Sequence, residues 1–143
     1  MRMLETTADV PQLIHWKRII LAGLLSEVAV MFTLSAVVAT YAFVSRPGRL
    51  AAEYQEIGQL AGYYAALPAA AVATFLMAYW AVRTLESGLI ANGLLVGVVA
   101  TLFAVSFIFT ARPADRPMYI ASFAARILAG GIAGFLALKM KGA

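Results

Sequence analysis

The chain has 143 residues, of which 63% are hydrophobic and only 13% are charged. Soluble domains carry about one quarter charged residues, so this chain has too little polar surface to cover a soluble core. It contains no cysteine, which excludes disulfides, thiolate metal ligands and a cysteine nucleophile. The net charge of +4 lies mostly beside apolar segments, which favours anchoring to lipid headgroups over nucleic-acid binding. The composition predicts an integral membrane protein.

The N-terminal segment is polar. It carries Glu5 and Asp9 and has no early apolar run, so it is unlike a cleavable signal peptide. We expect a tail over residues 1–18, followed by a single membrane domain over residues 19–141.

Four segments of that domain are long and apolar enough to cross a bilayer, whose core of about 30 Å needs roughly 20 helical residues. They are separated by "SRPGR", "RTLES" and "ARPADRP", where Pro and Arg end a helix at the interface. The apolar runs show no period-two alternation, so helices are expected and a barrel is not. The predicted fold is all-α, a polytopic bundle of four transmembrane helices. Its spans are Ile19 to Val44, Leu60 to Val82, Gly88 to Ala111 and Met118 to Leu138.

Basic residues flank these spans unequally. With both termini inside, the inner cations are Arg2, Lys17, Arg18, Arg83, Lys139 and Lys141. The outer cations are then Arg46, Arg49, Arg112 and Arg116. This bias predicts an N-in, C-in orientation, in the plasma (inner) membrane if the chain is bacterial.

Small residues recur four apart in three of the spans. Lipid tails are as apolar as leucine, so membrane helices associate through close backbone approach, which GxxxG-type ridges allow. The predicted packing residues are Gly58 and Gly62 in the second helix, which is expected to begin before its span, Gly93 and Gly97 in the third, and Gly130 and Gly134 in the fourth. They favour a tight bundle in the lipid bilayer. They also leave open a homo-oligomer or a place in a larger membrane complex.

Two charged residues lie deep in the spans. At 1.5 Å per residue, Glu27 is roughly 12 Å from the inner end of the first span, and Arg126 is roughly 12 Å from the outer end of the fourth. In a core of about 30 Å their heights differ by only some 6 Å. A charge at mid-helix costs about 2.5–3.5 kcal/mol to insert, so such residues face the protein interior and find partners. We therefore predict an intramembrane Glu27–Arg126 pair, with Asn92, Thr101 and Ser35 as candidate polar lining.

This pair has three interpretations. It can be a static pair that fixes helix register, or a working proton or substrate site. In the third interpretation Arg126 extends outward to the interface while Glu27 is protonated and unpaired.

Enzyme chemistry is not expected. His15 is the only histidine and lies at the membrane edge, so neither a zinc site nor bis-histidine haem ligation can form. The serines and threonines of the spans have no histidine or lysine base at a similar depth. No phosphate-binding loop or dinucleotide fingerprint is present. We expect no catalytic residue, no metal and no cofactor.

Two functions remain. The first is a non-enzymatic structural or accessory subunit of a membrane assembly. The second is a small proton-coupled transporter in which Glu27 carries protons or substrate.

The stretch "LAGLLSEV", residues 21–28, resembles the first helix of the small multidrug resistance family, whose members have four spans and work as dimers. The resemblance implies that Glu27 binds protons and cationic drugs. The chain departs from that family in its long N-terminal tail, in the lack of tryptophan in "NGLLVGVV" and in Arg126, which would compete with a cation. We therefore do not assign the chain to that family.

Overall fold

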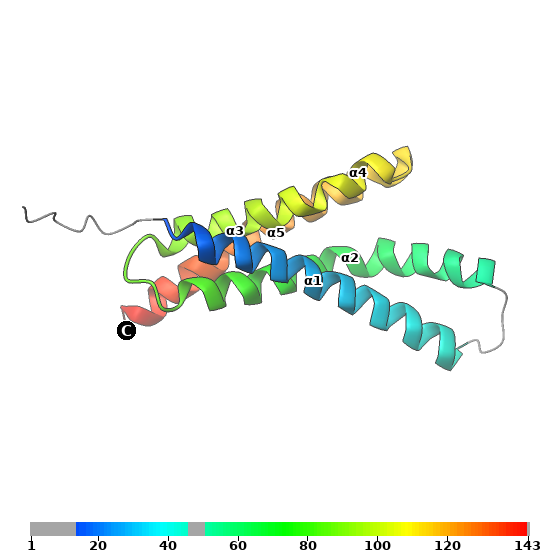
Figure 1. Ribbon diagram of the computed structural model, residues 1–143, viewed down its shortest axis with the longest axis horizontal. Coiled ribbons are helices and arrows are strands. Elements are labelled where there is room, and N and C mark those ends of the chain that lie inside the picture. The colour runs from blue at the N-terminus through cyan, green and yellow to red at the C-terminus, as the bar shows by residue number, and fades with distance from the viewer. Residues whose placement is uncertain (1–13, 46–50, 143) are drawn as a thin grey trace, which may run out of the picture.

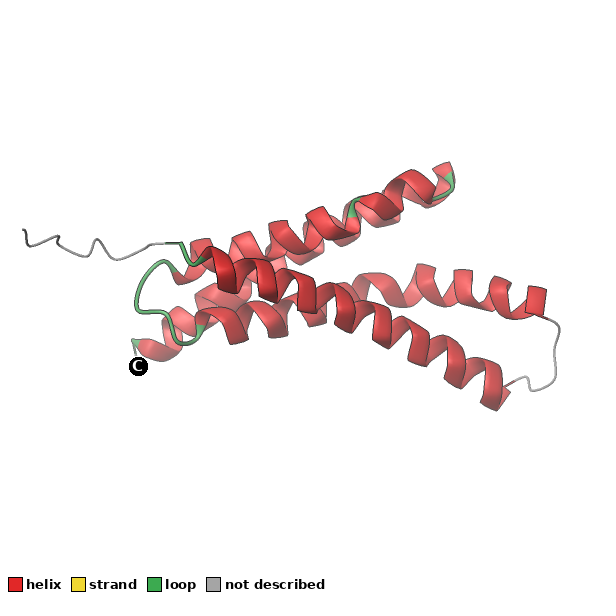
Figure 2. Cartoon of the chain, viewed as in Figure 1, coloured by secondary structure: helices red, strands yellow, loops and turns green. Residues whose placement is uncertain are grey.

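The computed structural model describes residues 14–45 and 51–142, which are helical almost throughout and include no strand. Four helices are long and apolar enough to cross a membrane, which confirms the predicted all-α bundle of a multi-pass membrane protein. The elements in chain order are α1 (Trp16–Thr40), the π-helical turn η1 (Tyr41–Ser45), α2 (Ala51–Val82), α3 (Leu89–Ala104), α4 (Ser106–Thr110), the 3-10 turn η2 (Pro113–Asp115) and α5 (Arg116–Lys141). Short loops and turns join them, as Figure 2 shows.

The helices extend past the predicted spans at several ends. Helix α1 begins at Trp16, so part of the expected tail is already helical, while residues 1–13 lie outside the described part. Helix α2 begins at Ala51, because the polar stretch before its span continues the helix. Helix α5 begins at Arg116 with a proline in its first turn. The backbone N–H groups of a first turn have no partner within the helix, so the N–H that proline lacks costs no hydrogen bond there.

In the four-helix bundle, α2 and α3 contact each other and lie between the other two long helices. Helix α1 packs on α2 and α3, and α5 packs on the same two helices. Helices α1 and α5 are therefore diagonal to each other across the bundle (Figure 1). A side-chain contact between them has to cross the bundle centre.

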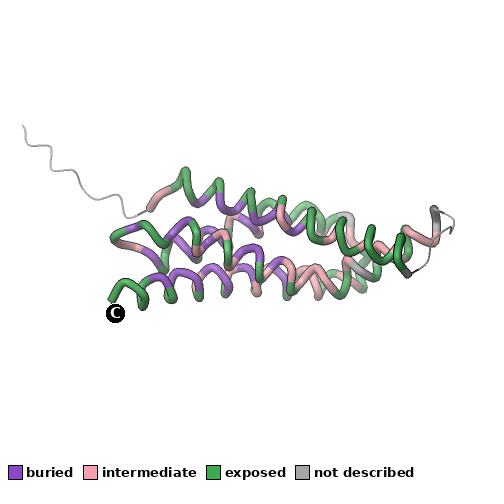
Figure 3. The backbone as a smooth tube through the Cα atoms, turned by 90° about the horizontal axis from the view of Figure 1, so that it is seen from below, coloured by how far each residue is buried: buried purple, intermediate pink, exposed green. Residues whose placement is uncertain are grey.

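The bundle is packed along only half of its length. Figure 1 shows the α1–α2 hairpin diverging from the α3–α4–α5 hairpin toward the end that carries α4. Figure 3 shows the buried residues gathered toward the end that carries the C-terminus. We call residues 16–30, 70–104 and 122–141 the packed half, and residues 31–45, 51–69 and 105–121 the splayed half. Among the described residues, the buried ones lie in the packed half.

Glycines bring α3 and α5 together in the packed half. A Cβ atom built on Gly93 would lie 2.3 Å from the carbonyl oxygen of Gly130, and one built on Gly134 would lie 2.5 Å from that of Leu89. No real Cβ comes so close to a backbone atom, so the two helices touch through their main chains. This geometry matches what GxxxG-type ridges permit.

The prediction that Gly58 and Gly62 also pack a helix is wrong within the chain. Among the described residues, a Cβ on Gly62 would meet nothing within 4 Å, and one on Gly58 would meet only the Val38 side chain at 3.9 Å. Both glycines lie in the splayed half of α2, where the hairpins have separated and no neighbouring backbone is within reach.

Polar contacts add to the packing of the same half. The hydroxyl groups of Ser26 and Thr74, both fully buried, share a 2.9 Å hydrogen bond between α1 and α2. At the end of the bundle, the ammonium of Lys141 donates to the carbonyl of Leu85, which ties α5 to the loop after α2.

Candidate functional site

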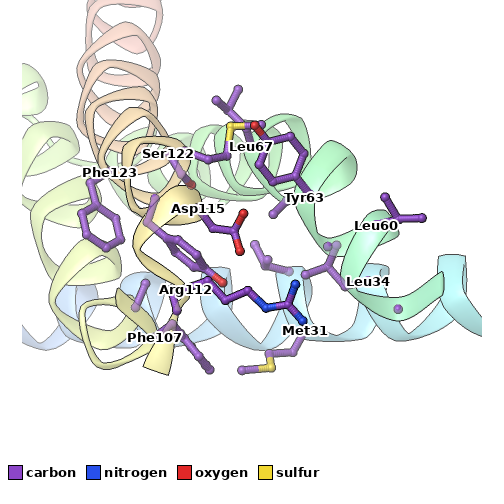
Figure 4. Close-up of a pocket in the computed structure, with 18 of the residues that line it drawn as sticks. Met31, Leu34, Leu60, Tyr63, Leu67, Phe107, Arg112, Asp115, Ser122 and Phe123 are labelled. Carbon is purple, nitrogen blue, oxygen red and sulfur yellow. The ribbon is translucent and has the colours of Figure 1, made fainter. Parts of the chain in front are cut away.

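A cavity of about 580 Å³ lies between the diverging hairpins. Its walls come from α1, α2, α4, η2 and α5, with the end of α3 closing one side. Figure 4 shows Met31 and Leu34 of α1 facing Ser122 and Phe123 of α5 across this space, with Tyr63 reaching in from α2. The cavity thus occupies the splayed half and ends where the packed half begins.

The inner end of the cavity is an ion pair. The Arg126 guanidinium and the Glu27 carboxylate contact each other, with side-chain exposures of only 5% and 11%. Arg126 Nη1 also donates to the carbonyl oxygen of Ala100 on α3 at 3.3 Å. The Arg126 Nε is buried and has no hydrogen-bond partner among the described residues. The two predicted residues are thus brought together across the diagonal of the bundle, with part of the arginine's donor capacity unfilled.

Helix α3 holds both charged residues in place. A Cβ on Gly97 would lie 2.5 Å from the Arg126 carbonyl oxygen, so α5 meets α3 at the level of the arginine. A Cβ on Gly23, one turn before Glu27, would lie 2.6 Å from Val99, so α1 rests on the opposite flank of the same helix. Small residues at both contacts let the two side chains reach each other around α3.

The walls of the cavity are mainly apolar, and its outer end is charged. Leu34, Leu67 and Phe123 are among the residues that form the walls. Glu56 and Arg112, both exposed, lie at the outer end together with Asp115. Figure 4 shows the side chains of Arg112 and Asp115 extending into the space between η2 and α1. The cavity therefore has a polar inner end, apolar walls and a polar mouth.

The three residues predicted as further polar lining do not line this cavity. Asn92 is buried in the packed half, where its Oδ1 accepts from the His15 backbone N–H and its Nδ2 donates to the Gly88 carbonyl. Thr101 donates to the Gly97 carbonyl of its own helix. Ser35 is exposed on α1. A polar residue within a span does not by itself specify the direction in which its side chain points.

Sequence reasoning missed several polar lining residues, namely Glu56, Tyr63, Arg112, Asp115, Tyr119 and Ser122. Ser122 had a recognisable signal, since it lies one helical turn before Arg126 on the same face of α5. The others depend on how far the hairpins diverge, which is a tertiary property.

In the part of the chain that the structure describes, no group of three His, Asp or Glu side chains is placed to hold a metal ion. No family model matches the chain, and no curated protein or solved structure matches it either. The site therefore has to be interpreted from its own geometry.

Proposed function

We propose that this multi-pass membrane protein binds a small amphiphilic solute between its hairpins and exchanges protons with it through Glu27, as a small proton-coupled transporter would. The observation that carries the proposal is the position of the ion pair at the inner end of a cavity of about 580 Å³. Small-molecule sites are typically concave and mostly apolar, with volumes of about 300–1,000 Å³ and a few convergent polar groups. An ion pair that only fixes helix register does not need a solute-sized cavity leading to it.

Charge distribution supports an orientation in which the cavity opens away from the cytoplasm. The described cations at the packed end are Lys17, Arg18, Arg83, Lys139 and Lys141, accompanied by one acid, Glu86. The described cations at the splayed end are Arg112 and Arg116, and Arg46 and Arg49 of the sequence between η1 and α2 bring the number on this side to four. Basic residues accumulate on the cytoplasmic side of membrane proteins, so the packed end, where α1 begins and α5 ends, is proposed to be cytoplasmic.

The proposal is tested by adding chain-matched solutes to protein in lipid nanodiscs and measuring pH in weakly buffered solution. The solutes are octanoate, octylammonium and octanol, with empty nanodiscs as the reference for partitioning into lipid. At least one solute should bind with proton uptake or release, and the Glu27→Gln variant should show no linked proton. The same substitution at Glu86, an exposed acid outside the cavity, is the matched control. If no solute binds above the empty-nanodisc signal, or protons still exchange in Glu27→Gln, the proposal fails.

A second candidate function is a structural or accessory subunit in which the pair fixes the register of α1 against α5. The burial of both charged side chains on diagonal helices favours it. This function predicts no ligand-linked protons. It predicts instead that the double variant Glu27→Gln/Arg126→Gln recovers folded protein that Glu27→Gln loses, measured by size-exclusion chromatography in detergent.

A further inference from the structure

The ion pair at the inner end of the cavity has unfilled hydrogen-bonding capacity. Arg126 carries five N–H donors, and Nη1 serves both Glu27 and the Ala100 carbonyl. Arg126 lines the cavity, and its side chain is only 5% exposed to solvent. Its Nε nevertheless has no hydrogen-bond partner among the described residues. A buried donor without an acceptor is unfavourable. The inner end is therefore suited to a ligand that brings an oxygen acceptor.

The chemistry of the two partners determines which charge such a ligand can carry. A cation that took Glu27 would leave Arg126 buried without a counter-charge, and arginine is not deprotonated in proteins. An anion that took Arg126 would leave Glu27 without its partner, but a carboxylate can be neutralised by a proton from water. Only the second exchange avoids an isolated buried charge.

The other ionisable groups that face the cavity do not change this conclusion. Arg112, Asp115 and Tyr119 face it from the α4–α5 connection and α5, and Glu56 and Tyr63 face it from α2. The part of α3 that lines it, Ala104, has no ionisable side chain. Glu56 and Arg112 are exposed at the mouth, where salt and water screen their charges. The inner end is where a charge is held away from water.

Apolar walls lie between the mouth and the pair, so the ligand needs an apolar body. We propose that the cavity binds a monocarboxylate with an apolar chain, whose carboxylate replaces that of Glu27 on Arg126 while Glu27 takes up one proton. The only bond formed is the O–H bond of protonated Glu27, whose proton comes from the solvent. One carboxylate and one proton enter, so the net charge at the inner end is unchanged. This inference rests on the proposed function and specifies its substrate class and the direction of proton movement.

The experiment is isothermal titration calorimetry of octanoate into nanodisc-embedded protein at pH 7, in two buffers that differ in ionisation enthalpy. Octanoate is ionised at this pH, as carboxylic acids are. About one proton should be taken up per octanoate bound, and the apparent Kd should rise roughly tenfold for each unit increase in pH. Octanoate should bind at least tenfold more tightly than octylammonium, which would leave a buried arginine unpaired.

Substitutions at Glu27 and Arg126 test the role of each residue in octanoate binding. In Glu27→Gln the ligand supplies the missing carboxylate, so octanoate should raise the melting temperature more than in the wild type and should bind with no proton taken up. Arg126→Gln should lose octanoate binding, whereas Arg116→Gln, an exposed arginine outside the cavity, should keep it. If either Glu27→Gln or Arg126→Gln does not fold, the wild-type proton count and the preference for octanoate over octylammonium still test the inference.

Three results would overturn the inference. Tighter binding of octylammonium, or proton release, would contradict the ligand class and leave the proposed function standing. Proton uptake that persists in Glu27→Gln would mean that octanoic acid carries its own proton, so Glu27 would have no part in it. Heats equal to those of empty nanodiscs for all three solutes would contradict both the inference and the proposed function.

Discussion

The packed half and the splayed half of this bundle are built from the same four helices but differ in what fills the space between them. In the packed half, glycine and alanine let the main chains touch, and buried hydroxyl groups pair between helices. In the splayed half, larger side chains such as Leu34 and Leu67 face a cavity. The comparison shows that small residues hold a membrane bundle together only where neighbouring backbones come within reach.

The ion pair lies at the boundary between the two halves, and breaking it should have the largest effect. Removing one partner from a buried pair costs about 3–5 kcal/mol of unfolding free energy. Glu27→Gln should be the worse variant, because the arginine that remains cannot lose its charge. In Arg126→Gln the remaining acid can be neutralised by a proton, so that variant should be more stable at acidic pH and lose stability as the pH rises. Thermal unfolding in detergent at about pH 5 and pH 8 measures both effects. Equal stability of the two variants at both pH values would contradict the asymmetry.

A matched pair of glycine substitutions tests the packing difference directly. Gly130→Ala puts a Cβ 2.2 Å from the Gly93 carbonyl oxygen, and a backbone atom has to move. We expect a loss of about 1–3 kcal/mol, as in other overpacked sites. Gly62→Ala meets nothing within 4 Å and should be neutral or slightly stabilising, since alanine favours the helix. Unfolding monitored by circular dichroism compares the two, and a Gly62→Ala variant as damaged as Gly130→Ala would mean that a partner chain packs on the splayed half of α2.

The hydroxyl pair of the packed half should contribute less. Thr74→Val leaves the buried Ser26 hydroxyl without its partner and should cost about 0.6 kcal/mol, the average for polar contacts between membrane helices, and at most about 1.7 kcal/mol. Thr33→Val is the control, because this exposed threonine donates to Ala29 of its own helix. The double variant Ser26→Ala/Thr74→Val should recover most of the loss, since neither side then has an unpaired polar group. The same unfolding measurement detects it, and additive losses in the double variant would argue against a direct interaction.

The spans and the Glu27–Arg126 pair could be predicted from the sequence because both follow from length and depth along a helix. A run of apolar residues fixes a span, and a rise of 1.5 Å per residue fixes the height of a charge. Direction around the helix was harder to predict. Asn92 and Ser35 are predicted as polar lining near the pair, yet Asn92 bonds His15 in the packed half and Ser35 is exposed.

The cavity itself could not be predicted from the sequence. Gly58 and Gly62 have the same spacing as Gly93 and Gly97, but only the second pair meets a neighbouring backbone. The difference depends on how far α2 has diverged from the other hairpin at that height, and local spacing contains no information about divergence. For the same reason Arg112 and Asp115, which lie in the α4–α5 connection, could not be assigned to a cavity that also contains residues of α1.

Labelling of introduced cysteines can determine which half of the bundle faces which side of the membrane, and it does not rely on a change in stability. The chain has no cysteine, so a single introduced cysteine reports its own exposure. Ser87→Cys lies in the loop between α2 and α3 at the packed end, and Ala114→Cys lies in η2 at the splayed end. With the more basic packed end in the cytoplasm, a membrane-impermeant maleimide should label Ala114→Cys in intact cells and Ser87→Cys only after the membrane is opened. The reverse pattern would place the mouth of the cavity in the cytoplasm, and labelling of both from outside would mean that the chain inserts in two orientations.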